Sequence, residues 1–151
     1  MMGEQPRTEP LFYYFRLEDQ IPEHHLLRRI DRYVDFSFVR ERLRGAYSPL
    51  GRPSIDPEIL LRLLLVGYLY GITSERRLME EMQYNFALRW FVGLSMGEEP
   101  WDVTVFTKNR ERFLRGAVAE AWLKAVVLEA DKCNLIDREH FSVDGTLIRD
   151  E

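Results

Sequence analysis

Apolar residues recur at helical spacing through most of this chain. Between residues 22 and 44 they fall three or four positions apart, and arginines occupy much of the remainder, which predicts two short amphipathic helices. The apolar positions are Leu26, Leu27, Ile30, Val34, Phe38, Val39 and Leu43. Two prolines and a glycine within residues 47–54 then predict a loop.

The strongest helix signal follows this loop. Asp56 is a favourable N-cap, and Pro57 suits the first helical position, where its missing N–H costs nothing. Leucines and valines then surround nearly the whole circumference, and Gly71 is expected to end the helix. Because a helix that is apolar all round is covered all round, we predict that it lies at the centre of the fold.

Another helix is predicted to begin beside Ser74. The hydroxyl of Ser74 can cap it, Leu78 and Met82 form its buried stripe, and Glu75 lies where the positive end of the helix dipole favours an acid. Residues 87–91 are then predicted to form a short turn.

A longer helix is predicted from Thr104 or Thr107 to about Ala130. Its apolar stripe repeats every three or four positions, which is the helical period. The stripe consists of Phe113, Leu114, Ala117, Val118, Ala121, Trp122, Ala125 and Leu128. One continuous amphipathic helix is therefore expected here.

Near the end of the chain the period changes from helical to alternating. His140, Ser142 and Asp144 share one face of a predicted strand, and Phe141 and Val143 share the other. Since a two-stranded hairpin is marginal alone, this element is interpreted as the beginning of a sheet. The predicted fold class is therefore mainly α, a multi-helical domain followed by a short β-strand or hairpin.

Composition restricts the class of protein. The 151 residues, 46% of them hydrophobic, suit one domain, or one domain and the beginning of another. The single cysteine, Cys133, excludes an intramolecular disulfide and fits a reducing compartment, so the cytoplasm is the expected location.

Charge and hydropathy restrict the partners. The longest apolar run, residues 59–72, is interrupted by Arg62 and is shorter than the roughly 20 residues that a bilayer requires, so no membrane partner is expected. The net charge of −4 gives no overall attraction to nucleic acid, so DNA binding would need a local basic face.

Several segments match a known pattern in register over roughly residues 20–148. They are 51–53 (GRP), 56–58 (DPE), 61–71 (LRLLLVGYLYG), 74–76 (SER), 88–94 (LRWFVGL), 106–110 (FTKNR) and 140–148 (HFSVDGTLI). Together they resemble bacterial insertion-sequence transposases of the DDE type, in which a helical InsH-like N-terminal domain precedes an RNase-H-like catalytic core.

The resemblance implies a metal-dependent site. In such enzymes two Asp and one Glu hold two divalent ions, usually Mg²⁺, which drive phosphodiester transfer. Asp144 matches the first of these carboxylates and is the candidate catalytic and metal-binding residue, although an Asp-Gly pair taken alone is most often a hairpin turn. The later acids, Asp150 and Glu151, are too close in sequence to complete the triad, so we expect this chain to be catalytically incomplete and to bind no functional Mg²⁺ alone.

Basic residues are the candidate DNA contacts. The chain has 18 Arg and three Lys, and Arg offers bidentate geometry to phosphate or guanine. The candidates are Arg52, Arg76, Arg77, Lys108, Arg110 and Arg112. The alternative is that arginines only solvate helix faces and form local ion pairs. On that interpretation Arg28, Arg29, Arg40 and Arg42 pair with Asp31, Asp35 and Glu41.

These observations predict three regions. They are a flexible arm at residues 1–20, a helical DNA-binding domain at 21–135, and the first strands of a truncated catalytic core at 136–151. Our hypothesis is the N-terminal part of a DDE transposase that binds insertion-sequence terminal repeats, with a second copy or an intact transposase as candidate protein partners. Two alternatives stay open: a non-catalytic remnant that dimerises or binds DNA and competes with intact transposase, and a pseudogene product without a selected role.

Overall fold

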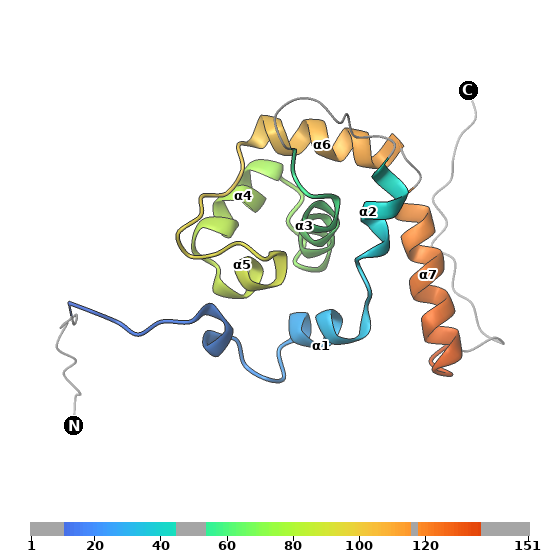
Figure 1. Ribbon diagram of the computed structural model, residues 1–151, viewed down its shortest axis with the longest axis horizontal. Coiled ribbons are helices and arrows are strands. Elements are labelled where there is room, and N and C mark those ends of the chain that lie inside the picture. The colour runs from blue at the N-terminus through green and yellow to red at the C-terminus, as the bar shows by residue number, and fades with distance from the viewer. Residues whose placement is uncertain (1–10, 45–53, 116–117, 137–151) are drawn as a thin grey trace.

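The computed structural model describes residues 11–44, 54–115 and 118–136, and this part of the chain is mainly helical (Figure 1). The elements are the 3₁₀ turn η1 (Leu17–Gln20) and the helices α1 (Leu26–Tyr33), α2 (Phe38–Leu43), α3 (Pro57–Leu69), α4 (Glu75–Tyr84), α5 (Phe86–Val92), α6 (Val103–Arg115) and α7 (Val118–Lys132). The predicted mainly α class is confirmed. The predicted strand around Asp144 lies outside the described residues.

Helix α3 lies at the centre of the bundle, as the sequence predicts, and Figure 1 shows it end-on. It contacts α2, α5 and α6. Its buried residues are Leu60, Leu61, Leu63, Val66 and Gly67. The Asp56 carboxylate caps it by accepting a hydrogen bond from the Glu58 N–H at 2.9 Å. Gly71 follows α3 with a φ of +63°, in the left-handed region that favours glycine.

The predicted start of α4 is also confirmed. The Ser74 hydroxyl accepts a hydrogen bond from the Arg77 N–H at 3.3 Å, and Leu78 and Met82 are buried. Before the loop, the two short helices predicted between residues 22 and 44 are α1 and α2.

The turn predicted at residues 87–91 is wrong, because these residues belong to helix α5. Asn85 ends α4 and also caps α5, where its side-chain oxygen accepts a hydrogen bond from the Leu88 N–H at 3.2 Å. Gly93, with a φ of +89°, ends α5. A helix of seven residues buries most of its surface and shows little periodicity, so its sequence carries a weak signal.

The single long helix predicted up to about Ala130 is also wrong. The structure has two helices, α6 and α7, which contact each other. Phe113 and Val118 are buried on either side of the break, so the apolar period continues across it. Gly116 stands at the break, and glycine is a poor helix former.

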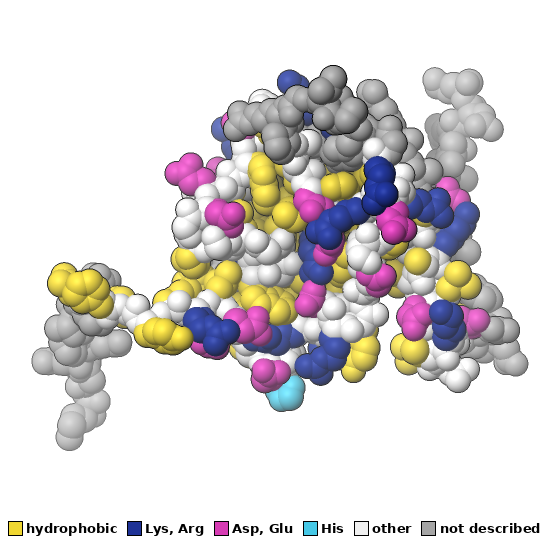
Figure 2. Space-filling view, viewed as in Figure 1, with side chains coloured by type: hydrophobic (Ala, Val, Ile, Leu, Met, Phe, Trp, Pro, Cys, Tyr) yellow, Lys and Arg dark blue, Asp and Glu magenta, His cyan; other side chains and the backbone are white. Residues whose placement is uncertain are grey.

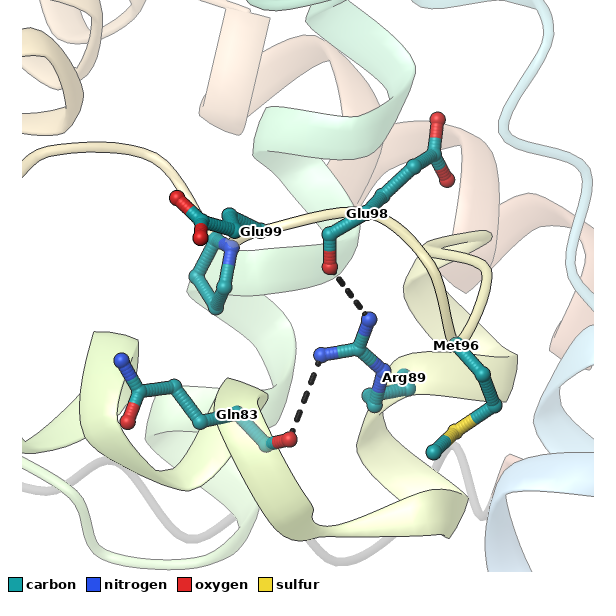
Figure 3. A pocket seen from close by; sticks show the side chains of 6 residues that line it. Gln83, Arg89, Met96, Glu98 and Glu99 are labelled. Carbon is teal, nitrogen blue, oxygen red and sulfur yellow. Dashed lines mark hydrogen bonds between the residues drawn. The ribbon is translucent and has the colours of Figure 1, made fainter.

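A buried arginine joins three segments of the bundle. Arg89, on α5, is only 2% exposed. Its Nη1 donates to the carbonyls of Met82 at 2.6 Å and Gln83 at 3.4 Å. Its Nη2 donates to the carbonyl of Glu98 at 2.6 Å and to that of Ser95. Figure 3 draws the bonds to Gln83 and Glu98. The first two segments that Arg89 joins are α5 and the end of α4, whose last carbonyls carry partial negative charge. The third is the loop that follows α5.

Replacing Arg89 is expected to destabilise the fold. In Arg89→Ala, buried carbonyls lose their donors, and each such group costs roughly 1–3 kcal/mol, so we expect the free energy of unfolding to fall by about 3 kcal/mol. Urea denaturation followed by circular dichroism measures this change. The matched control is Arg32→Ala, on the exposed side of α1, which should change stability by less than about 0.5 kcal/mol. Equal stability of the two variants would contradict the role given to Arg89.

Glu98 is expected to make the same loop sensitive to acid. The Ser95 N–H donates to Glu98 Oε2 at 2.7 Å and, with a smaller contribution from the Arg89 charge, lowers the pKa of Glu98. A carboxyl whose pKa is lower in the folded state is protonated first in the unfolded chain, so its stabilising effect is lost as pH falls below about 4.5. Glu98→Gln should therefore be less stable than wild type at pH 7, and the difference should shrink in acid. Urea midpoints across a pH series test this, and a difference independent of pH would refute it.

Candidate nucleic-acid interface

The fold places most of the candidate DNA contacts on two neighbouring helices. Arg76 and Arg77 lie in the first turn of α4, and Lys108, Arg110 and Arg112 lie on α6. Helices α4 and α6 pack directly against each other, at the upper part of the bundle in Figure 1. We call the exposed sides of these two helices the α4–α6 surface.

Two candidate residues lie outside the described part of the chain. These are Arg52 and Asp144, so their predicted roles remain predictions. Ser54, two positions after Arg52, hydrogen-bonds the buried side chain of Asn109 on α6. The chain therefore enters the described fold beside the helix that carries Lys108.

Arg110 is engaged inside the domain. Its Nε lies 2.9 Å from Glu75 Oε1, in an ion pair between α6 and α4. The hydroxyl of Thr107, one turn earlier on α6, hydrogen-bonds the other oxygen of the same carboxylate. The Glu75 carboxylate thus fastens the two helices together, and it holds the guanidinium of Arg110 against α4.

The other cations of the α4–α6 surface are exposed. Arg76, Arg77, Lys108 and Arg112 all have exposed side chains. With respect to the described residues, the side chains of Arg76, Arg77 and Lys108 form no ion pair. Exposed cations on packed helices can meet DNA phosphates without breaking any contact of the fold.

Several arginines that the sequence could assign only to helix faces instead support the core. Arg62, on α3, reaches Asp31 Oδ1 at 2.6 Å and the Phe91 carbonyl at 3.0 Å. Its guanidinium carbon also lies 4.3 Å from the ring centroid of Phe36. Arg62 therefore links α3 to α1 and α5.

The local ion pairs predicted for Arg28 and Arg40 are wrong, because both side chains bind residues that are distant in sequence. Arg28 binds Glu18 of η1 and lies 4.8 Å from the ring centroid of Trp90. Arg40 binds the capping residue Asp56, with an Nη2–Oδ2 distance of 2.9 Å. These partners lie 10 and 16 residues away, beyond the reach of any pattern along one helix.

Charge on the face shown in Figure 2 is mixed. Basic and acidic side chains lie side by side there. Ion pairs of this kind include those of Arg40 and Arg62 with Glu58 at the start of α3. This face therefore offers no broad basic area, and the net charge of −4 likewise gives no overall attraction to nucleic acid.

A recess beside Arg89 suits DNA less well. It has a volume of about 370 Å³ and is lined by Gln83, Arg89, Met96, Glu98, Glu99 and Pro100. Figure 3 shows the carboxylates of Glu98 and Glu99 directed away from Arg89. The Nη1 and Nη2 of Arg89 already donate to backbone carbonyls, and its buried Nε has no partner among the described residues. Acids at its rim would repel phosphate.

Neither a cluster of metal ligands nor a membrane-spanning helix occurs in the described residues. Within residues 11–44, 54–115 and 118–136, no three His, Cys, Asp or Glu side chains gather as metal ligands would. Asp144 lies outside these ranges, so the Mg²⁺ chemistry that the resemblance implies stays a prediction. Among the described helices, none is both long and apolar enough to cross a bilayer.

Comparison with known proteins identifies the family. The model of the transposase domain family (DUF772) matches residues 15–112, from just before η1 through most of α6. This range covers about two thirds of the chain and includes the whole α4 helix and the exposed Lys108. No curated protein and no solved structure matches the chain. The predicted relationship to transposases is confirmed, and the chain belongs to the transposase domain family.

Proposed function

We propose that this chain is the DNA-binding part of a DDE-type insertion-sequence transposase and that it binds the terminal repeats of the element. One structural observation carries the proposal: Arg76, Arg77 and Lys108 lie exposed on two packed helices, without ion-pair partners among the described residues. The family match supplies the biological context, since a transposase must hold the ends of its element.

The chemistry of this surface suits a phosphate backbone. The first turn of α4 carries two guanidinium groups beside the positive end of the helix dipole, which favours an anion. Lys108 adds a charge from the neighbouring helix. Contacts of this type position a protein on DNA, and Arg in particular can also read guanine through two parallel hydrogen bonds. Arg52 lies outside the described residues and stays a candidate contact from the sequence alone.

The catalytic part of the proposal concerns Asp144. We assign it, from the resemblance alone, as the first carboxylate of the DDE triad, where Mg²⁺ would activate the attacking hydroxyl and stabilise the leaving oxygen. Asp144 lies outside the described residues, so nothing in the described fold tests this assignment. Its role in the reaction is therefore a proposal separate from DNA binding.

Charge reversal on α4 is expected to weaken DNA binding. We expect Arg76→Glu/Arg77→Glu to lower affinity at least about tenfold. Because two phosphate contacts are lost, the slope of log K against log salt should also become shallower by about two. The measurement is fluorescence anisotropy over a salt series, with duplexes that carry the inverted repeats flanking the gene and random duplexes of equal length.

The matched control reverses two charges elsewhere. Arg29→Glu/Arg32→Glu changes the net charge by the same amount on exposed α1, at the opposite end of the bundle from α6 in Figure 1. If both double variants lose affinity equally, net charge governs binding and the α4–α6 surface is not the contact. No preference of wild type for the repeats over random duplex would remove terminal-repeat recognition.

Variants of Lys108 and Arg110 should distinguish an effect on DNA binding from an effect on the stability of the fold. Lys108→Ala is expected to weaken binding to all duplexes alike and to reduce the salt slope by about one, because it removes one phosphate contact and no contact of the fold. Arg110→Ala removes the ion pair with Glu75 and should instead lower the free energy of unfolding by about 1 kcal/mol. Anisotropy and urea denaturation of both variants test this, and a loss of stability in Lys108→Ala would contradict it.

A further inference from the structure

Helix α7 exposes more apolar surface than a helix at the edge of a domain should. Leu123 is 58% exposed, Val127 46% and Leu128 61%. Val118 is buried, and the ring of Trp122 stacks on that of Phe36 with their centroids 6.1 Å apart. The N-terminal half of α7 therefore packs on the bundle. A helix that is apolar on most sides is normally covered on most sides.

We propose that a second copy of this chain covers this face, through antiparallel pairing of the two α7 helices about a twofold axis close to Val127. Leu123, Val127 and Ala130 follow one another at intervals of four and three residues, so they form one stripe along the helix. In a twofold dimer the same stripe is used by both copies, which requires that it be complementary to itself. This inference does not rest on DNA binding.

The charges beside the stripe are complementary in the antiparallel arrangement. Lys124 and Asp131 are seven residues apart, so they lie two turns apart on the same edge of α7. Lys124 stands three residues before Val127 and Asp131 four residues after it. A twofold axis near Val127 therefore brings Lys124 of each copy opposite Asp131 of the other. In a parallel pair the twofold axis runs along the helices and puts this edge of the two copies on opposite sides of the dimer, so Lys124 and Asp131 would not meet.

The existing contacts of Lys124 are compatible with this arrangement. Its Nζ binds Glu120 of the same helix at 2.6 Å, and the side chain is 72% exposed. An ammonium group has three donors and can bridge two carboxylates. The carboxylate of Asp131, which already takes part in an interaction within the chain, can likewise accept from more than one donor. Exposed ion pairs contribute little affinity, so the apolar stripe is expected to supply the affinity and the charges to select the direction.

Sedimentation equilibrium of the full chain over a wide range of concentration tests the pairing. We expect a monomer–dimer equilibrium in wild type and a dissociation constant raised at least about tenfold in Val127→Glu, which places two carboxylates at the twofold axis. Leu26→Glu, at an apolar residue 48% exposed on α1, is the matched control and should dimerise as wild type does. A wild-type chain that stays monomeric would overturn the proposal and would leave another segment of the same chain as the cover of α7.

Cysteine cross-linking tests the direction independently. Cys133 is exposed, six residues beyond Val127, so in an antiparallel pair its two copies lie roughly 15–18 Å apart along the helix axis, too far for a disulfide. Oxidised wild type should therefore not cross-link within the dimer, and Val127→Cys/Cys133→Ser should. Dimers that cross-link through Cys133 but not through residue 127 would overturn the antiparallel arrangement.

Discussion

The charge of one buried guanidinium constrains the arrangement of α4, α5 and the loop after α5. Arg89 cannot be left without acceptors, because an unpaired charge away from water is very costly. Its acceptors are backbone carbonyls, which become available only where α4 ends and where the loop passes over α5. The end of α4 is thus fixed. The same helix buries Leu78 and Met82 and leaves Arg76 and Arg77, in its first turn, exposed.

Other arginines act in the same way, which changes the meaning of the excess of Arg over Lys. Arg28, Arg40 and Arg62 each connect segments that are distant in sequence, and Arg110 fastens α6 to α4. A planar guanidinium can satisfy several fixed acceptors at once, and an ammonium group offers no such fork. These four and Arg89 therefore serve the fold, and an excess of Arg over Lys is not by itself a sign of nucleic-acid binding.

Local signals in the sequence predicted the local structure well. Asp56 and Gly71 mark the two ends of α3, and Ser74 marks the start of α4, because caps act within a few residues. The missed break between α6 and α7 has a physical cause, since apolar residues continue in register past Gly116. The contact between α4 and α6, which creates the candidate surface, depends on the packing of segments about 30 residues apart and has no local signature.

The two proposed surfaces are connected through the order of the helices. Helix α6 carries Lys108 and contacts α7 directly, so a twofold axis on α7 would relate two α4–α6 surfaces at a fixed separation. The terminal repeats of an insertion sequence are inverted, and a twofold protein is matched to DNA sites of that symmetry. Two weak local surfaces held at a fixed distance bind such a pair far more tightly than either binds alone. Dimerisation through α7 would thereby bring two copies of Arg76, Arg77 and Lys108 to one pair of repeats.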